Sequence, residues 1–117
     1  MTNLKFMDLS YNALVGTVPT TFSLLNRVSI KLSHNQLSDI SNVLGSISSL
    51  TTLDLSYNLI KGPIPSSFSY HSMLQYIYLD NNQISGTIPE FLGTLSSLKT
   101  LNLTNNQLNG TIPSSLL

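Results

Sequence analysis

Apolar residues recur along this chain in one fixed pattern, apolar-x-Leu-x-x, and each copy of the pattern ends at an asparagine. The five asparagines are separated by 23, 23, 24 and 24 residues: Asn12, Asn35, Asn58, Asn82 and Asn106. Self-similarity at such a period predicts a solenoid in which each repeat forms one turn. A single turn is too thin to bury its own apolar side chains, so successive turns must stack on one another.

The residues before each asparagine predict a short strand. In the pair Leu53 and Leu55, a strand of period two directs both leucines inward and Asp54 outward. Strands of successive turns then pair in parallel at a spacing of about 4.8 Å. The inward apolar positions form a continuous column: Leu4, Met7, Leu9 and Leu14; Ile30, Leu32 and Leu37; Leu50, Leu53, Leu55 and Ile60; Leu74, Ile77, Leu79 and Ile84; Leu98, Leu101, Leu103 and Leu108.

The asparagines themselves are predicted to be structural. Where the strand ends, an inward amide offers two donors and an acceptor to backbone groups that the turn leaves unpaired. The five asparagines would therefore form a ladder. Loss of one of them would leave buried groups unpaired at a cost of about 1 to 3 kcal/mol.

Four repeats continue with glycine, a variable residue, valine or isoleucine, and proline, at 16–19, 62–65, 86–89 and 110–113. Glycine tolerates a positive φ, and proline fixes φ and removes a donor, so a helix is excluded there. Beyond the first three of these prolines, apolar positions spaced by three predict a short 3₁₀ turn on the convex side: Phe22 and Leu25, Phe68 and His71, Leu92 and Leu95. His71 replaces a leucine, and we expect a partly buried histidine, with a surface role as the alternative.

The second repeat departs from the pattern twice. Asp39 to Asn42 replace the Gly-x-Ile-Pro segment and are one residue short, so this turn should lack the regular convex extension. A residue is also missing between Val28 and Ile30 by comparison with Leu50 and Leu53. The second strand is therefore either shortened or begins at Arg27.

These residues resemble the leucine-rich repeat, and the Gly-x-Ile-Pro segments resemble the plant-specific extracellular subclass found in receptor-like kinases and receptor-like proteins. The resemblance implies an α/β-class solenoid, a right-handed superhelix with a concave parallel sheet, convex turns and 3₁₀ segments, and no long helices. It implies a single domain over 1–117 with about five repeats. Members usually carry cysteine-containing caps, and this chain has no cysteine, so we expect it to be uncapped at both ends.

Composition favours a binding scaffold. The chain is 41% hydrophobic and only 9% charged, with a formal net charge of zero, so no basic field attracts nucleic acid or acidic membranes. Without cysteine, and with two histidines far apart at His34 and His71, neither a thiolate metal site nor a disulfide framework is expected, and no cofactor is implied. No apolar run is long enough to span a membrane, and residues 1–5 do not resemble a secretory signal.

Side chains between the leucines are displayed on the concave sheet, where recognition is expected. The central column is Asp8, Lys31, Asp54, Tyr78 and Asn102; the flanking columns are Phe6, Ser29, Thr52, Tyr76 and Thr100, and Ser10, Ser33, Ser56, Asp80 and Thr104; Tyr11, His34, Tyr57, Asn81 and Asn105 close the face. From these we predict seven ligand-binding residues: Phe6, Asp8, Lys31, Tyr57, Tyr76, Tyr78 and Asp80.

Each feature of this face also has a plainer interpretation. The alternation of Asp8, Lys31 and Asp54 is explained by charge screening between neighbouring turns, where an exposed pair contributes at most about 1 kcal/mol. The cluster of Tyr57, Tyr76 and Tyr78 fits an interface anchor, but tyrosine is also a good strand former. The resemblance implies a protein or peptide partner, possibly another leucine-rich-repeat ectodomain, at the cell surface or outside the cell as part of a longer parent.

Two triplets match the N-glycosylation pattern, at Asn102 and Asn109. Both are predicted to face solvent, and a glycan on Asn102 would displace ligand contacts from that part of the sheet. Such triplets also arise easily in an Asn- and Ser-rich repeat.

The sequence also allows three functions other than recognition. Ser10, Ser33 or Ser56 with His34 and Asp54 supply the residue types of a catalytic triad, but an open repeated sheet lacks a water-excluding cavity and an oxyanion hole. The chain is therefore not expected to be an enzyme. An inhibitor similar to the polygalacturonase inhibitors, which share this repeat type, and a structural spacer within a longer array remain alternatives.

Overall fold

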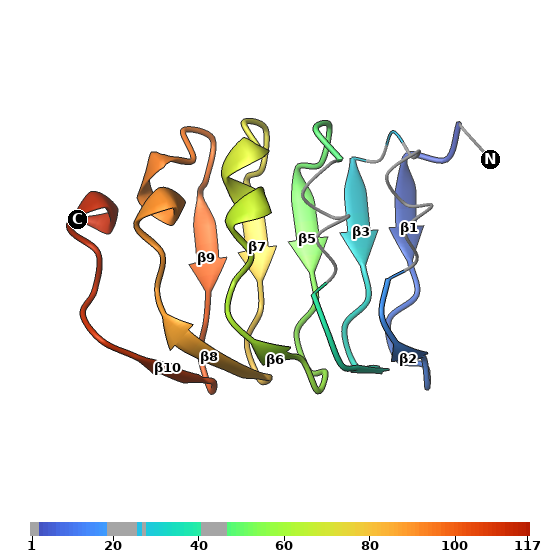
Figure 1. Cartoon of the computed structure of the whole chain (residues 1–117). Coiled ribbons are helices and arrows are strands. Elements are labelled where there is room, and N and C mark those ends of the chain that lie inside the picture. The colour runs from blue at the N-terminus through green and yellow to red at the C-terminus, as the bar shows by residue number, and fades with distance from the viewer. Residues whose placement is uncertain (1–2, 19–25, 27, 41–46) are drawn as a thin grey trace.

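The computed structural model describes residues 3–18, 26, 28–40 and 47–117. These residues form a solenoid of parallel strands, in which each repeat makes one coil and lies beside the next (Figure 1). The predicted leucine-rich-repeat architecture is confirmed. In the part of the chain that the structure describes, no helix exceeds five residues, and no helix is long and apolar enough to cross a membrane.

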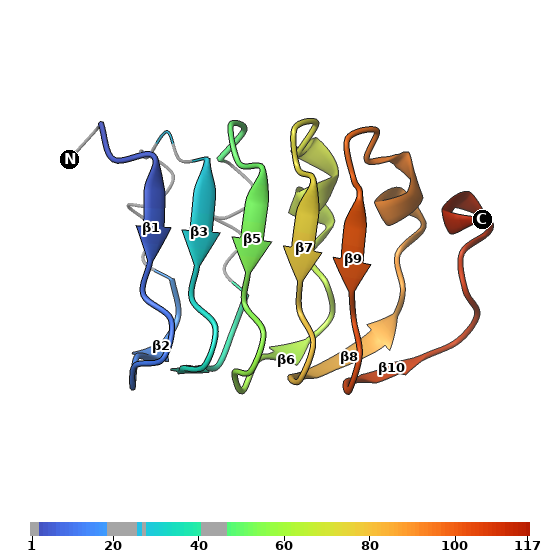
Figure 2. The same ribbon diagram turned by 180° about the vertical axis from the view of Figure 1, so that it is seen from behind.

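One sheet runs the length of the molecule. Its strands are β1 (Phe6–Asp8), β3 (Ser29–Lys31), β5 (Thr52–Asp54), β7 (Tyr76–Tyr78) and β9 (Thr100–Asn102), in that order and all parallel. The register aligns the repeats, so that Ile30 lies opposite both Met7 and Leu53. Figure 2 shows the five strands side by side.

A second set of short strands follows each asparagine, and the sequence analysis did not predict it. β2 (Val15–Gly16) pairs in parallel with β4 (Gln36–Leu37). β8 (Gln83–Thr87) pairs in parallel with both β6 (Lys61–Gly62) and β10 (Gln107–Asn109). Extended backbone after the turn explains these strands, because stacked coils bring equivalent segments into hydrogen-bonding distance.

Short 3₁₀ helices form the convex side, as predicted. They are η3 (Ser66–Tyr70), η4 (Glu90–Thr94) and η5 (Ser114–Leu116), and each begins directly after a proline. Phe68 and Leu92 point from η3 and η4 into the core. The corresponding predictions for Phe22 and Leu25, and for the segment from Ser41 to Asn42, lie outside the described residues.

The core is the predicted column of inward aliphatic residues. Leu53, Ile77 and Ile84 are completely buried, as are Leu50, Ile60 and Leu74. Each is enclosed by coils on both sides. The first coil has a neighbour on one side only, and its Leu4, Leu9 and Leu14 are 40–41% exposed.

Two sequence predictions are resolved by the second and third coils. The second strand is not shortened: β3 has three residues, and the Val28 N–H donates to the Lys5 carbonyl just as the Thr51 N–H donates to the Val28 carbonyl. Arg27 lies outside the described residues. His71 is fully buried rather than partly buried, and its ring meets that of Phe68 edge-on, with centroids 5.9 Å apart.

Candidate recognition surface

The asparagine ladder fixes each coil to the coil before it. The Asn58 Nδ2 donates to the Leu55 and Ser56 carbonyls of its own turn, and at 3.0 Å to the Leu32 carbonyl of the preceding coil. Its Oδ1 accepts the Leu37 N–H at 2.9 Å. One amide therefore closes its own turn and fastens two coils together, as the sequence predicted.

The same bonds recur at Asn35, Asn82 and Asn106. Asn12 differs because it lies in the first coil. It is exposed, and among the residues that the structure describes its Nδ2 donates only to the Leu9 and Ser10 carbonyls of its own turn. The predicted ladder is present, but only four of its five members join neighbouring coils.

The residue before each ladder asparagine adopts a left-handed backbone. At this position of the five repeats, φ lies between 53 and 57°: Tyr11, His34, Tyr57, Asn81 and Asn105. This conformation ends the strand and aligns equivalent side chains of neighbouring coils. The Tyr11, His34 and Tyr57 rings consequently form one stack with centroids 4.1 and 4.2 Å apart, and the Asn105 amide donates to the Asn81 Oδ1 at 3.0 Å.

Three polar residues of the central column accept hydrogen bonds from residues just beyond the end of their own strand. The Oδ1 atoms of Asp8, Asp54 and Asn102 each accept the N–H of the residue two positions later, at 3.0 or 3.1 Å. At Asp54 and Asn102 the hydroxyl of that residue donates as well, at 2.7 and 2.6 Å. An Asp or Asn two residues before a Ser or Thr is therefore a local turn device of this repeat.

The Asp8 carboxyl shows the electrostatic effect of this device. Hydrogen bonding by the Ser10 side chain, then by the Ser10 N–H, lowers the pKa of Asp8 below its usual range, and the positive charge of Lys31 adds to the effect. No salt bridge within 4.0 Å joins Lys31 to Asp8 or Asp54 among the described residues. The charge of Lys31 thus acts on Asp8 over a longer distance than that of a salt bridge.

The column that follows is buried in the three inner coils, whereas Ser10 is half-buried and Thr104 is exposed in the terminal coils. Ser33, Ser56 and Asp80 are only 6, 7 and 8% exposed. The Oδ2 of Asp80 accepts a hydrogen bond from the Asn81 amide at 2.9 Å. Asp80, which is predicted to bind a ligand, is therefore largely buried, and its carboxylate is engaged by the next residue of its own turn.

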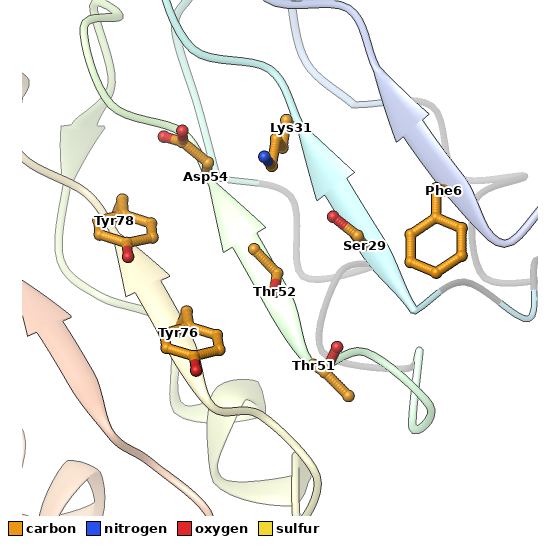
Figure 3. Close-up of a pocket in the computed structure, with 8 residues that line it drawn as sticks. All are labelled: Phe6, Ser29, Lys31, Thr51, Thr52, Asp54, Tyr76 and Tyr78. Atoms are coloured by element: carbon orange, nitrogen blue, oxygen red, sulfur yellow. The ribbon is translucent and has the colours of Figure 1, made fainter.

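An open depression of about 580 Å³ lies on the concave sheet over β1, β3, β5 and β7 (Figure 3). Its lining combines aromatic rings with hydroxyl and charged groups: Phe6, Ser29, Lys31, Thr51, Thr52, Asp54, Tyr76 and Tyr78. Phe6 is 69% exposed, whereas Tyr76 and Tyr78 are half-buried. Phe6, Lys31, Tyr76 and Tyr78 thus line one depression, with Phe6 and the tyrosines on opposite sides of it, whereas Tyr57 lies in the aromatic stack and Asp8 lines a second hollow with Lys31.

Several polar groups of this depression are unused by the protein. Within the described part of the chain, neither the Lys31 ammonium nor the hydroxyls of Tyr76 and Tyr78 make a hydrogen bond to another residue. Asp54 is already engaged by Ser56. Among the described residues, the Lys31 ammonium and the phenols of Tyr76 and Tyr78 thus have unoccupied bonding capacity, as do the Ser29 and Thr52 hydroxyls, and the exposed Phe6 ring lies at the opposite side of the depression from the tyrosines (Figure 3).

The hydroxyls and the imidazole considered for catalysis make other contacts than those of a serine–histidine pair. The Ser56 hydroxyl donates to Asp54, the Ser33 hydroxyl donates to Ser10, and His34 lies in the aromatic stack. Across the residues placed by the structure, no group of three or more His, Asp or Glu side chains could hold a metal ion.

The two glycosylation triplets differ in their surroundings. Asn102 is half-buried at the end of β9 and accepts a hydrogen bond from the hydroxyl of Thr104, which is the third member of its own triplet. Asn109 is exposed at the end of β10. The Asn102 triplet is thus also one of the Asp/Asn-x-Ser/Thr turn devices described above.

Comparison with protein families agrees with this architecture. Three leucine-rich-repeat models match the chain, over residues 3–25, 28–84 and 72–116. This chain belongs to the leucine-rich-repeat family. Among proteins of curated function, none matches it.

Solved structures of plant receptor ectodomains share the fold of this leucine-rich-repeat protein. The BIR3–SERK2 complex from Arabidopsis thaliana is 38% identical with a TM-score of 0.91, covering 94% of this chain and 60% of the other. The plant peptide hormone receptor RGFR1 in complex with RGF2 is 35% identical with a TM-score of 0.94, covering 98% of this chain and 19% of the other. The Arabidopsis receptor kinase HAESA ectodomain, in complex with an IDA peptide hormone, is 32% identical with a TM-score of 0.92, covering 98% and 20%.

The leucine-rich-repeat protein described here therefore spans at most 60% of the length of these relatives. Its coils are of the kind found in receptor-kinase ectodomains, some of which were solved with peptide hormones or co-receptors bound.

Proposed function

We propose that this chain is a non-catalytic recognition module that binds a protein or peptide through its concave sheet. The observation that carries the proposal is the set of unused groups in one depression: the Lys31 ammonium, the phenols of Tyr76 and Tyr78, and the exposed ring of Phe6. Exposed aromatic side chains next to free hydrogen-bonding groups are typical anchors of protein interfaces.

The chemistry of these groups defines the ligand. The two tyrosines project from the same face of β7, two residues apart, while Lys31 projects from β3 (Figure 3). A ligand that reaches both must cross the strands, along the axis of the solenoid. An extended peptide with an apolar or aromatic side chain for the tyrosines and an acidic group for Lys31 meets these requirements.

The comparisons support this function at a coarser level. RGFR1 and HAESA were solved with peptide hormones, and HAESA also with the co-receptor SERK1. By analogy, we propose that the present chain acts as part of the extracellular region of a longer receptor-like protein, and that a second leucine-rich-repeat ectodomain is an alternative partner.

A displayed peptide library tests the location of the binding surface. Peptides selected on the 117-residue chain would be measured by interferometry against the wild-type chain and the Tyr76→Ala/Tyr78→Ala variant. Loss of both phenols should weaken binding by at least about tenfold, because truncation of aromatic anchors commonly costs more than 1 kcal/mol.

Tyr70→Ala is the matched control, because Tyr70 lies in the convex helix η3 and is 77% exposed. It should leave affinity unchanged. If the selected peptides bind the double variant as tightly as the wild type, recognition does not take place in this depression.

A further inference from the structure

The inner coils place a carboxylate beside an aromatic ring on the concave sheet. Asp54 of β5 has Lys31 of β3 and Tyr78 of β7 as its register partners. Neighbouring strands of a sheet lie about 4.8 Å apart, so these three side chains form a row across the second, third and fourth coils. Figure 3 shows Asp54 between the other two, and all three line the depression.

The Asp54 carboxylate is held in one orientation with one oxygen to spare. The Ser56 N–H and the Ser56 hydroxyl both donate to Oδ1, at 3.0 and 2.7 Å. The Oδ2 atom accepts no hydrogen bond from any residue that the structure describes. A ligand donor can therefore bond to Oδ2 without reorganising the side chain, which lowers the entropic cost of binding.

The negative charge of Asp54 is not needed by the turn that its side chain closes. Asn102 occupies the equivalent position two coils later and is neutral. Its Oδ1 accepts the same two bonds, from the Thr104 N–H at 3.1 Å and the Thr104 hydroxyl at 2.6 Å. An asparagine would thus serve the fold at position 54 equally well, and the charge of Asp54 is available for binding.

Lys31 does not neutralise Asp54 by contact. No salt bridge within 4.0 Å joins the two side chains, although they are register partners. Lys31 also has Asp8 as its register partner on the other side. One ammonium therefore lies between two carboxylates, and negative charge remains beside Tyr78.

A carboxylate next to an aromatic ring is a binding site for a cation. The ring attracts positive charge through its π electrons, and the carboxylate supplies a charged acceptor. A guanidinium group suits this pair better than an ammonium group, because its planar fork can lie against the Tyr78 ring while it donates to the Asp54 Oδ2.

We propose that the bound peptide carries a basic side chain, preferably arginine, that donates to the Asp54 Oδ2 and lies against the ring of Tyr78. The inference rests on the proposed function, because it specifies the ligand of the same depression. An acidic group then binds Lys31 and an apolar group binds Tyr76. Across β3, β5 and β7 the ligand reads acidic, basic and apolar.

The geometry of an extended peptide sets the spacing of these three groups. Alternate side chains point to the same side, about 6.6 Å apart, whereas the strands that they cross are about 4.8 Å apart. The long side chains of Lys31 and of the ligand arginine can take up the difference. The expected pattern is therefore acidic-x-basic-x-apolar, where x is any residue.

The displayed peptide library is the probe. Peptides selected on the wild-type chain should be enriched in an arginine or lysine two positions from an aspartate or glutamate. One selected peptide, and its copy with glutamine in place of the basic residue, would then be measured by interferometry. Asp54→Asn should weaken the parent peptide at least about fivefold and the glutamine copy about twofold or less, so that the double-mutant cycle shows coupling.

Two controls isolate the charge. Asp54→Asn should keep the wild-type circular dichroism spectrum, because Asn102 already closes the same turn. Glu90→Gln removes one negative charge from the exposed start of the convex helix η4, and both peptides should bind it like the wild type. Added salt should reduce the coupling, since it screens exposed charges.

The outcomes separate this inference from the proposed function. Suppose that the selected peptides lose affinity for Tyr76→Ala/Tyr78→Ala but lack a basic residue, or bind Asp54→Asn as tightly as the wild type. The basic group is then refuted, while recognition by the depression stands. Peptides that bind the double tyrosine variant unchanged would refute both.

Discussion

The imidazole ring of His34 is stacked on the phenol ring of Tyr57, with centroids 4.2 Å apart and planes 10° apart. Both residues have a φ of 53°. The stack and the left-handed backbone have one origin, because each residue occupies the turn position before a ladder asparagine. The stability of the stack therefore depends on which side chains tolerate that backbone.

His34→Val should destabilise the chain by about 1 to 2 kcal/mol, because a β-branched residue strains the left-handed region and removes a ring contact. His34→Asn should cost less, since Asn81 and Asn105 occupy the same position with a φ of 56°. Urea unfolding measures both. Equal losses for the two variants would show that backbone strain does not distinguish them.

Asn58→Ala should be strongly destabilising. The Asn58 amide is buried, donates to three carbonyls and accepts the Leu37 N–H. Leaving these groups unpaired should reduce the free energy of unfolding by about 3 kcal/mol. Asn12→Ala is the matched control, because Asn12 is exposed and bonds only within its own turn; its loss should stay below about 1 kcal/mol. Urea denaturation at constant pH gives both values, and comparable losses would remove the distinction between inner and terminal members of the ladder.

Ser10→Ala should raise the pKa of Asp8 toward the ordinary value, because the Ser10 side chain is the main cause of its lowering. A lowered pKa in the folded state favours the ionised carboxylate. The stability it contributes is therefore present above the ordinary pKa of Asp and is lost as the pH falls through the lowered pKa. Carbon-13 NMR titration of the Asp8 carboxyl measures the shift, with Ser29→Ala as control. An unchanged titration in Ser10→Ala would exclude the proposed cause.

Gly93→Ala should loosen the end of the chain. A Cβ at Gly93 would overlap the side chain and backbone of Ser115, whose hydroxyl donates to the Glu90 carbonyl at 2.7 Å. The helix η5 must then move away from η4. Hydrogen exchange at the Leu116 and Leu117 amides should accelerate, whereas Thr94→Ala should leave it unchanged. Unaltered exchange in Gly93→Ala would mean that η5 does not rest on this glycine.

Glycosylation can be separated from the turn at Asn102 by two variants. Asn102→Asp removes the acceptor triplet but retains an oxygen for the Thr104 hydrogen bonds, so folding should be preserved. Expression through a secretory pathway, followed by intact-mass measurement, should show the loss of one glycan mass. Asn109→Gln tests the other triplet. If neither variant changes the mass of the secreted protein, neither asparagine is modified.

Much of this fold is predictable from the sequence because the repeat constrains it. The positions of Leu53, Leu55 and Asn58 require a strand, an inward face and a turn, and all three are present. The second set of strands was not predicted, because segments of two to five residues that follow the turn, such as Lys61–Gly62, carry no clear periodicity. Only the stacking of adjacent coils makes them strands.

The recognition surface was harder to predict than the core. The alternation of inward and outward side chains along each strand correctly places Lys31, Tyr76 and Tyr78 on one face. The same alternation predicts that Asp80 is equally exposed, and it is buried. Alternation fails there because the strand ends and the backbone twists into the left-handed turn at Asn81. The hydrogen bonds of Asp8 and Asp54 to the residue two positions later could have been inferred from the recurring Asp-Leu-Ser sequence.

The ladder bond between Asn58 and the coil before it has an evolutionary consequence. Because every junction uses the same amide and the same carbonyl, a duplicated block of 23 or 24 residues can enter the gene without any new kind of contact. The length of the solenoid can thus change by insertion of whole repeats, while point substitutions in the outward columns change which ligand is bound. Length and selectivity can evolve separately in such a molecule.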